Sequence, residues 1–457
     1  MHKKVFFLTA LCFFISLSAY AKNGGYIVKL KEDAHFDNAE GLEILSETCR
    51  LYFAETLSDI ENIKEFVEFY EKNSEIELEE ETVNVMTEPS DPYYASHQTG
   101  LKMVNAQGAW NLEAYGNDVR VAVIDSGCNP HTDIINNLVE GKNYLDGSND
   151  VTDEHGHGTN VCGIIAAEMN GIGVTGIAPK VKIVPLKCFG ANGKAGMDVI
   201  IPAFEEAINN FNCQVINMSL GTTKSSESLE MLIESAYQKG IIVVAAAGNT
   251  GNEDNSLNYP AAYDKVIGVG SVNSSKIRSD FSQHNEAVFV TAPGEGVVST
   301  YYRGGYAAYS GTSQATPFVS GFAAIALSMD KDLTVNEFMD LLKDSSENLG
   351  AEGWDEEYGY GLMNAGAAAE LLASKKNAYV SPLNDNGSET YVYIRNNSET
   401  QLNALSIFAS YSENALSDVV KTSLKLDKND GIIVNFPHSD ENITHFLWNY
   451  NMTPVIR

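Results

Sequence analysis

The chain has few basic residues for its length: 30 Lys and Arg stand against 61 Asp and Glu among 457 residues, and the net charge is -31. Phosphate backbones are bound by clustered basic side chains, so this deficit argues against nucleic acid as a partner. Six cysteines are too few to build a disulfide-based scaffold. Beyond the N-terminus no apolar run approaches the ~20 residues that cross a bilayer. We therefore do not expect an integral membrane protein.

The N-terminus has the pattern of a secretory signal peptide. Lys3 and Lys4 precede an apolar run over residues 5–17, and the small residues Ala19 and Ala21 flank a candidate cleavage point. We expect residues 1–21 to be removed and the mature protein to be secreted to the extracellular space.

Residues 22–89 differ in composition from the rest of the chain. Residues 22–88 carry 18 acidic and 6 basic residues. A strand-like stretch at 26–30, a helical pattern around 60–70 and a loose alternation over 75–85 predict a small α+β unit. The alternatives are a removable leader segment and a permanent N-terminal domain.

Residues 90–376 alternate between strand and helix patterns. Short, nearly continuous apolar runs occur at 119–124, 182–186, 215–218, 241–246 and 266–269, and helical stretches occur at 201–210 and 229–239. Strands with this pattern are buried on both faces by helices. The alternation predicts an α/β fold with a doubly wound parallel sheet, whose functional residues lie at the carboxyl ends of the strands.

Residues 377–457 change again. Strand-like runs at 391–395, 405–411 and 432–436 are separated by Asn, Asp, Ser and Gly turns. We predict a small β-rich domain, whose role the sequence leaves open.

Three segments offer the groups that acyl transfer by a hydroxyl requires: a nucleophile, a base and donors for the oxyanion. Asp125 ends a buried strand, His157 opens a helix, and Ser313 lies at the start of an apolar helix, where the helix dipole favours negative charge. Taken singly, each has an ordinary explanation as a turn cap, a core histidine or an N-cap. Their order along the chain and their flanking residues favour catalysis.

These segments resemble those of the subtilisin-like serine peptidases, or subtilases, over residues 91–370. The matching motifs are Asp125-Ser-Gly, His157-Gly-Thr, Ala245-Ala-Ala-Gly-Asn249 and Gly311-Thr-Ser313. The stretch 90–98 is most similar to the thermitase branch. The resemblance implies an Asp125, His157 and Ser313 triad in a subtilisin-like fold, with the Asn249 side chain as a donor to the oxyanion. Asn249 also follows an apolar strand, which agrees with that role.

The resemblance also implies where a polypeptide substrate binds. Ser219, Leu220 and Gly221 are similar to the extended segment that pairs with the substrate backbone, and residues 190–196 are similar to the opposite wall. Asn258 would lie at the floor of the P1 pocket. Because that pocket is uncharged, we predict a preference for aromatic or large aliphatic P1 residues.

Two positions depart from the family pattern: Gln314 replaces a common Met, and Asn160 replaces a common His. Neither change removes a catalytic group. Cys128 and Cys162 lie near the catalytic segments in sequence. They are either small buried apolar residues or thiols whose oxidation would inhibit the enzyme.

Calcium is the cofactor that the resemblance implies. The loop 166–174 has the length of the family's strong calcium loop, and its oxygen donors suit a hard cation. The alternative is a glycine loop without metal. The implied ligands are Asp91, Asp133, Glu168, Asn170, Ile172 and Val174.

We therefore expect a secreted serine endopeptidase. By the resemblance, residues 22–89 are its propeptide and intramolecular inhibitor, cut near residues 86–90. A peptide-binding or adhesive protein on a protease scaffold is a second hypothesis, which the intact triad disfavours. A narrow processing protease, rather than a broad degrader, is a third.

Overall fold

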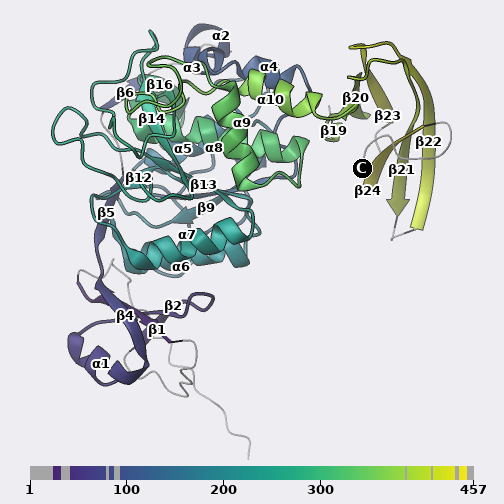
Figure 1. The fold of residues 1–457 in the computed structure, drawn as a ribbon. Coiled ribbons are helices and arrows are strands. Elements are labelled where there is room, and N and C mark those ends of the chain that lie inside the picture. The colour runs from purple at the N-terminus through teal and green to yellow at the C-terminus, as the bar shows by residue number, and fades with distance from the viewer. Residues whose placement is uncertain are drawn as a thin grey trace, which may run out of the picture.

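The computed structural model describes residues 24–31, 42–78, 82–86, 93–385, 389–412, 415–437 and 442–449. They form a large central domain, a small N-terminal unit and a β domain on one side (Figure 1). The expected signal peptide and the candidate ligand Asp91 lie outside the described residues. Within those ranges, no helix has the length and apolar character needed to cross a membrane.

A seven-stranded sheet forms the centre of the large domain. Its order is β15-β14-β13-β11-β7-β9-β8, and all neighbouring strands run parallel. The doubly wound α/β prediction is confirmed. The bounds are β7 Arg120–Asp125, β8 Lys142–Asn143, β9 Lys182–Lys187, β11 Val215–Met218, β13 Ile242–Ala246, β14 Val266–Val272 and β15 Val290–Pro293.

Helices cover both faces of this sheet (Figure 1). Val121 and Val123 of β7 share a core with α5 (His157–Ala166) and α8 (Thr312–Met329). Ala122 and Ile124 point to the opposite face, where they share a core with α6 (Met197–Asn209) and α7 (Glu227–Gln238). Because alternate residues face opposite helix layers, every residue of such a strand must be apolar.

The predicted helices at 201–210 and 229–239 correspond to α6 and α7. Ser226 caps α7 by accepting the Leu229 amide, and Gly240 follows the helix with a φ of +75°. The other elements of the central domain are α2 Tyr93–Ser96, α3 Thr99–Met103, α4 Ala106–Trp110, η2 Ile135–Asn137, β10 Lys194–Gly196, β12 Leu220–Gly221, β16 Val297–Thr300, β17 Tyr306–Ser310, α9 Val335–Ser345 and α10 Ala365–Ser374.

The N-terminal unit is an antiparallel sheet of order β2-β3-β1-β4 with one short helix. The helix predicted around 60–70 is wrong, because α1 ends at Glu61 and the chain enters a strand at Val67. Side chains from 67 to 72 alternate between half-buried and exposed, which is the pattern of a strand. The bounds are β1 Tyr26–Leu30, β2 Leu42–Ser46, β3 Leu51–Ala54, α1 Leu57–Glu61, η1 Lys64–Phe66, β4 Val67–Lys72, β5 Glu75–Leu78 and β6 Thr82–Met86.

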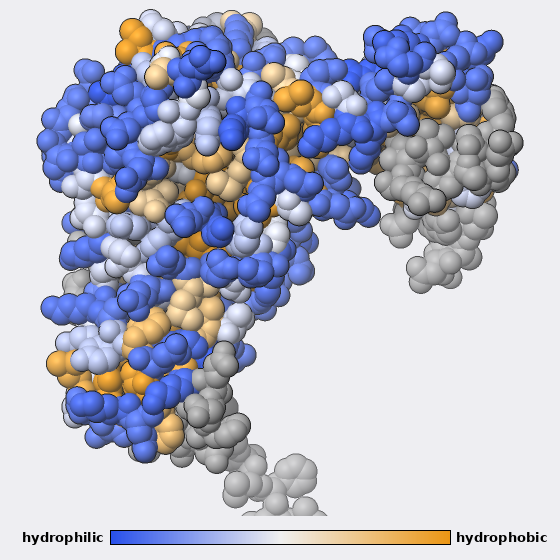
Figure 2. Space-filling view, viewed as in Figure 1, coloured by the Kyte–Doolittle hydropathy of each residue, from blue (hydrophilic) through white to orange (hydrophobic). Residues whose placement is uncertain are grey.

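Hydrophilic residues cover most of the visible face of the central domain, whereas apolar residues gather on the N-terminal unit (Figure 2). Ile44 and Leu57 of that unit are exposed.

The C-terminal domain consists of two small antiparallel sheets. One contains β18, β20, β19 and β23, and the other has the order β22-β21-β24. The strands predicted at 391–395, 405–411 and 432–436 are confirmed within β20, β21 and β23. The bounds are β18 Ala378–Val380, β19 Asn384–Asp385, β20 Glu389–Asn396, β21 Leu402–Ser412, β22 Ala415–Leu426, β23 Gly431–Pro437 and β24 Asn442–Asn449.

Candidate active site

Asp125 and His157 form a buried pair at the carboxyl end of the central strand β7. Asp125 is the last residue of β7 and His157 the first of α5, and both are 0% exposed. His157 Nδ1 lies 2.9 Å from Asp125 Oδ1 and 3.0 Å from Oδ2. A carboxylate on Nδ1 holds the proton there, which makes Nε2 the nitrogen that accepts a proton.

A further carboxylate, Asp153, joins the residue after Asp125 to the start of the helix that carries His157. Its Oδ1 accepts the Ser126 hydroxyl at 2.8 Å and the Gly156 amide at 2.7 Å, and its Oδ2 accepts the amide and hydroxyl of Thr159 at 2.9 and 2.6 Å. Asp153 is 1% exposed, so these bonds form away from water. The sequence analysis missed this residue. An acidic residue just before a helix start is an N-terminal capping signal that could have identified it.

The start of α5 touches the loop after β7 through its backbone. A Cβ added to Gly158 would lie 2.2 Å from the Gly127 carbonyl oxygen and 3.0 Å from Asp125 Oδ1. The Gly158 amide donates to the Ser126 hydroxyl at 2.9 Å. Only glycine fits at position 158, and the helix therefore sits directly on the Asp125 segment.

Ser313 is the second residue of α8 and is also 0% exposed. Its hydroxyl donates to the Ser219 carbonyl oxygen at 3.0 Å, and the Ser219 hydroxyl donates to the Ser313 carbonyl oxygen at 2.9 Å. The predicted nucleophile is thus next to the predicted substrate-binding segment. Helix α8 also packs against α5, which carries His157.

Asn249 is held with its amide group ready to donate. Its Oδ1 accepts the amide and hydroxyl of Thr312 at 2.9 and 3.0 Å. Its Nδ2 is buried and has no hydrogen-bond partner among the described residues. An unpaired buried donor costs folding free energy, and it is the arrangement that a developing oxyanion would satisfy.

A strand of the N-terminal unit lies in the predicted substrate groove (Figure 1). Strand β5 pairs antiparallel with β12 on one side, with Leu78 opposite Leu220, and with β10 on the other, with Ile76 opposite Ala195. The predicted groove walls, 219–221 and 190–196, therefore accept an extended peptide through main-chain hydrogen bonds.

Asn258 lies directly behind Gly221. A Cβ added to Gly221 would lie 1.9 Å from Asn258 Nδ2. Asn258 is 3% exposed, and its Nδ2 donates to the Ala246 carbonyl oxygen at 3.2 Å. The structure thus brings this predicted pocket residue against the groove strand.

Asp133 and the loop 168–174 lie together, as the calcium prediction requires. The Asp133 carbonyl oxygen accepts the Glu168 amide at 2.7 Å, and Oδ2 accepts the Val174 amide at 2.8 Å. Asn170 Oδ1 instead accepts the Ile172 amide at 3.0 Å. The available donors are oxygens, which fits calcium. Among the described residues, however, no group of three or more His, Cys, Asp or Glu converges on one point.

The two departures from the family pattern are fully buried polar side chains. Asn160 and Gln314 are 0% exposed, and neither side-chain amide has a hydrogen-bond partner among the described residues. Cys128 and Cys162 are buried free thiols. Burial, followed by a hydrogen bond with Cys128, raises the pKa of Cys162 well above its usual range, so the reactive thiolate is disfavoured.

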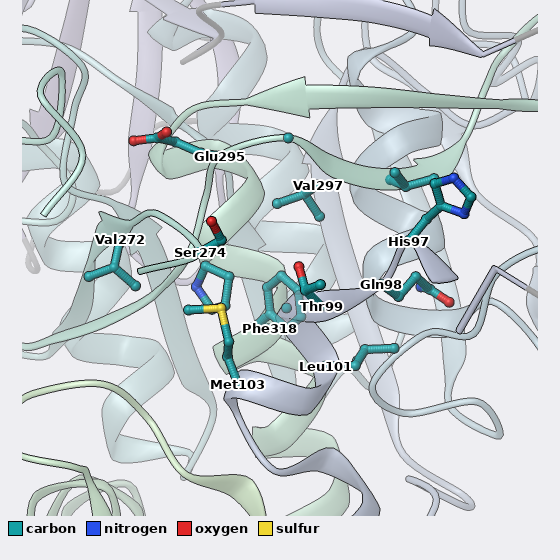
Figure 3. A pocket seen from close by; sticks show the side chains of 14 residues that line it. His97, Gln98, Thr99, Leu101, Met103, Val272, Ser274, Glu295, Val297 and Phe318 are labelled. Carbon is teal, nitrogen blue, oxygen red and sulfur yellow. The ribbon is translucent and has the colours of Figure 1, made fainter. Parts of the chain in front are cut away.

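A separate small pocket lies beside α3 and β16 (Figure 3). Thr99, Met103, Val297 and Phe318 are among its lining residues. None of the predicted site residues lines it, so it is not the predicted catalytic site.

Comparison with known proteins agrees with this geometry. Residues 116–361, more than half of the chain, match the model of the Subtilase family. The chain is 39% identical over 274 residues to Subtilisin DY of Bacillus licheniformis, covering 59% of this chain and 98% of that protein. It is 38% identical over 271 residues to a Thermostable alkaline protease of Halalkalibacterium halodurans, covering 59% of this chain and 73% of that protein.

A longer relative matches over a smaller share of its length. The chain is 35% identical over 299 residues to Minor extracellular protease Epr of Bacillus subtilis strain 168, covering 64% of this chain and 46% of Epr. The chain thus spans about half of that relative. The similarity to the thermitase branch stays a prediction. On the family match and these relatives, the chain belongs to the subtilase family of subtilisin-like serine endopeptidases.

Proposed function

We propose that this protein hydrolyses peptide bonds within polypeptides, with Ser313 as nucleophile, His157 as general base and Asp125 as the group that orients His157. The buried Asp125–His157 pair carries this proposal, because a carboxylate and an imidazole are aligned at the end of a groove that already holds a peptide strand.

In the proposed reaction, Ser313 Oγ attacks the scissile carbonyl carbon while His157 Nε2 accepts the hydroxyl proton. Asp125 stabilises the imidazolium that results. The Asn249 side-chain amide and the Ser313 backbone amide donate to the oxyanion. His157 then returns the proton to the leaving amine, and water, activated by the same imidazole, hydrolyses the acyl-enzyme.

The experiment that tests this proposal compares the wild type with Ser313→Ala, with casein as the substrate. We expect hydrolysis to fall by more than about 10⁴-fold, as is typical when a serine protease loses its nucleophile. Ser328→Ala is a matched control on the same helix, since that hydroxyl donates only within α8, to the Ile325 carbonyl oxygen. Ser313→Ala activity within tenfold of the wild type would refute the assignment.

We further propose that residues 22–89 act as the intramolecular inhibitor. Strand β5 occupies the groove in place of substrate, and a second contact holds the unit on α7. There, Glu71 accepts the Glu227 amide at 2.8 Å and the Ser228 amide at 3.1 Å at the helix N-terminus. A carboxylate at this position is favoured by the helix dipole.

The register of the strands supports a self-cleavage earlier than the expected residues 86–90, so that the released inhibitor would end before Thr82. Leu78 ends β5 opposite Leu220, and Thr82 begins β6 opposite Ser310 of β17. Ser219 exchanges hydrogen bonds with Ser313, and Ser310 lies three residues before Ser313 in the chain. We therefore expect the cut between Leu78 and Thr82, where the joining residues are three glutamates. N-terminal sequencing of the mature enzyme distinguishes the two positions.

Cleavage after Leu78 would place a large aliphatic residue in P1, as expected from the uncharged pocket around Asn258, whereas cleavage after any of the three glutamates would place an acidic residue there. Profiling a peptide library tests both statements at once. A strict basic preference would contradict both.

The inhibitor proposal predicts a lag before activity appears. Glu71→Gln removes the charge at the start of α7, and we expect the lag to shorten by about fivefold. Glu61→Gln is the control, because the ion pair of Glu61 within the described residues is with Lys64, on the solvent-exposed surface of the same unit. An unchanged lag in Glu71→Gln would mean that this contact does not hold the inhibitor.

Calcium and secretion complete the proposal. Asp133, Asn170 and the carbonyl oxygens of Glu168, Ile172 and Val174 would hold the ion together with Asp91. The bound calcium ion would fix the loop 168–174 and so raise the free energy of unfolding. A chelator that leaves the melting temperature unchanged would argue for a metal-free loop.

Detection of the enzyme in the culture medium, with an N-terminus beyond residue 21, tests secretion.

A further inference from the structure

The C-terminal domain has one sheet that docks on the central domain and one that does not. In the docking sheet, the Tyr391 ring lies 5.9 Å from the Lys180 ammonium of the central domain, and Arg395 pairs with Glu370 of α10 at 2.9 Å. The Tyr379 hydroxyl also donates to the Leu112 carbonyl oxygen at 3.0 Å. The second sheet, β22-β21-β24, lies on the side away from the central domain (Figure 1).

The two faces of this outer sheet differ in character. Its inner face contributes Phe408, Leu424 and Leu447 to the domain core. Side chains alternate along each strand, so the neighbouring residues project outward. On that outer face, Leu405 lies opposite Trp448, and Ile407 lies between Lys421 and Phe446.

The outer face presents aromatic rings to solvent. Phe446 is 38% exposed, and its ring centroid lies 6.3 Å from that of the half-buried Trp448. On the adjacent strand, the half-buried Leu405 flanks these rings, and Ile407 is buried next to Phe446 with 8% exposure. Partly exposed aromatic rings on one face of a sheet are typical of a contact surface.

The charge of this face is opposite to that of the chain. Lys421 and Lys425 both project from it and are exposed, and neither forms an ion pair with a described carboxylate. None of the outward-facing side chains that the structure describes on this sheet is acidic. The domain as a whole is also less acidic, with nine Asp and Glu against five Lys and Arg in residues 377–457.

From these observations we propose that the outer sheet binds an anionic polysaccharide. The rings of Phe446 and Trp448 stack against the apolar faces of sugar rings, and Lys421 and Lys425 pair with carboxylate, sulfate or phosphate groups. The two lysines are four residues apart on one strand, about 13 Å, which suits a polymer better than a single sugar. The catalytic domain's negative charge is screened beyond about 8 Å at physiological salt, so it does not prevent contact at this sheet.

Other partners fit the face less well. A neutral glycan would leave the two lysines without function, and a membrane would require apolar residues on protruding loops rather than on a flat sheet. Single-stranded nucleic acid also combines stacking with positive charge. It therefore serves as a competing arm of the test.

The experiment measures binding of the full-length chain, in a Ser313→Ala background that prevents self-digestion. The probes are polygalacturonate, heparin, neutral amylose and single-stranded DNA, each at low and high salt. We expect binding to polygalacturonate or heparin that weakens with salt, and little binding to amylose or DNA. Lys421→Gln with Lys425→Gln should weaken binding by about fivefold, and Phe446→Ala by about tenfold.

Matched variants separate this face from the rest of the domain. Lys428→Gln tests a lysine of the same domain that pairs with Glu399 away from the sheet face, and Ile433→Ala tests an apolar residue that is 50% exposed on the other sheet. Both should bind like the parent protein. The proposal would be overturned by salt-insensitive binding to amylose or by preferential binding to DNA. It would also be overturned if Lys428→Gln lost as much affinity as Lys421→Gln with Lys425→Gln. Binding to none of the probes would also overturn it. The peptidase assignment does not depend on any of these outcomes.

Discussion

The central domain and the C-terminal domain bury charged groups to different extents. The central domain places Asp125, Asp133, Asp153 and Lys187 at 3% exposure or less. Among the described residues of the C-terminal domain, no Asp, Glu, Lys or Arg is buried. Burying a charge without partners is unfavourable, so a domain retains it only where several hydrogen bonds compensate and a function needs it. In the central domain, the buried charges thus lie at the candidate active site and at the predicted calcium loop, whereas the buried polar groups of the C-terminal domain are uncharged residues that contribute to stability.

Asp153→Asn gives the largest expected effect and is the most direct way to break this comparison. The substitution removes the charge and directs an amide group toward donors from Ser126, Gly156 and Thr159. We expect kcat to fall by about 10²-fold with little change in KM, because the residue positions His157 without touching substrate.

Asp150→Asn is the matched control for Asp153. Asp150 lies three residues earlier on the exposed surface, and its carboxylate accepts only the amide and hydroxyl of Thr152. Circular dichroism of both variants establishes that they fold. A folded Asp153→Asn enzyme with wild-type kcat would mean that this buried charge serves only the fold.

His445 tests whether a largely buried polar group of the C-terminal domain contributes to stability alone. It lies against the Phe408 ring and bonds the Ser406 hydroxyl at 2.8 Å. Burial lowers the pKa of His445 to about 4. In the unfolded chain the His445 imidazole has its usual pKa near 6.5. The contribution of this residue to stability is therefore complete above pH 6.5 and is lost as the pH falls toward 4.

We expect about 2–3 kcal/mol of unfolding free energy to be lost over that window, with no change in peptide hydrolysis at neutral pH. His445→Gln keeps a hydrogen-bonding group that does not titrate, and should flatten the pH dependence. Thermal unfolding between pH 4 and pH 7 measures it, with His97→Gln as an exposed control. A parallel pH dependence in His445→Gln and the wild type would contradict the expectation.

Gln314 refines the comparison with the smallest effect. Its amide is fully buried and unpaired among the described residues, directly after the nucleophile. Gln314→Met removes that unpaired group and should raise the unfolding free energy by about 1 kcal/mol. If kcat is retained, the polarity of this residue has no part in the reaction. A fall in both stability and kcat would show that the amide has a partner in the working enzyme.

The sequence predicted well those features that follow from local pattern. The run Val215–Met218 is one strand with the predicted bounds, because a strand covered on both faces must be apolar throughout. The pairing of Asp125 with His157 was predicted from the order of the motifs and their resemblance to the subtilases, and the strand-end and helix-start positions agreed with it. The helix expected around residues 60–70 failed, since Val67, Phe69 and Glu71 belong to a strand whose partner, β1, lies 40 residues earlier.

Features that depend on contacts between distant segments could not be predicted from sequence. Glu75–Leu78 is a short acidic stretch, and nothing in it indicates pairing with β10 and β12 on both sides. The role of Asp153 depends on Ser126, which lies on a different strand-end loop, and on Thr159 in α5. Such positions become evident only when the chain is folded.

The backbone contact at Gly158 determines how closely α5 approaches the loop after β7. With no side chain between the helix and the loop after β7, there is no packing layer whose size could be adjusted to move the imidazole relative to its carboxylate. Any heavier residue would push the two elements apart. The distance between the Asp125 carboxylate and the His157 imidazole is therefore fixed by backbone contact and cannot be tuned by a side chain between the two elements.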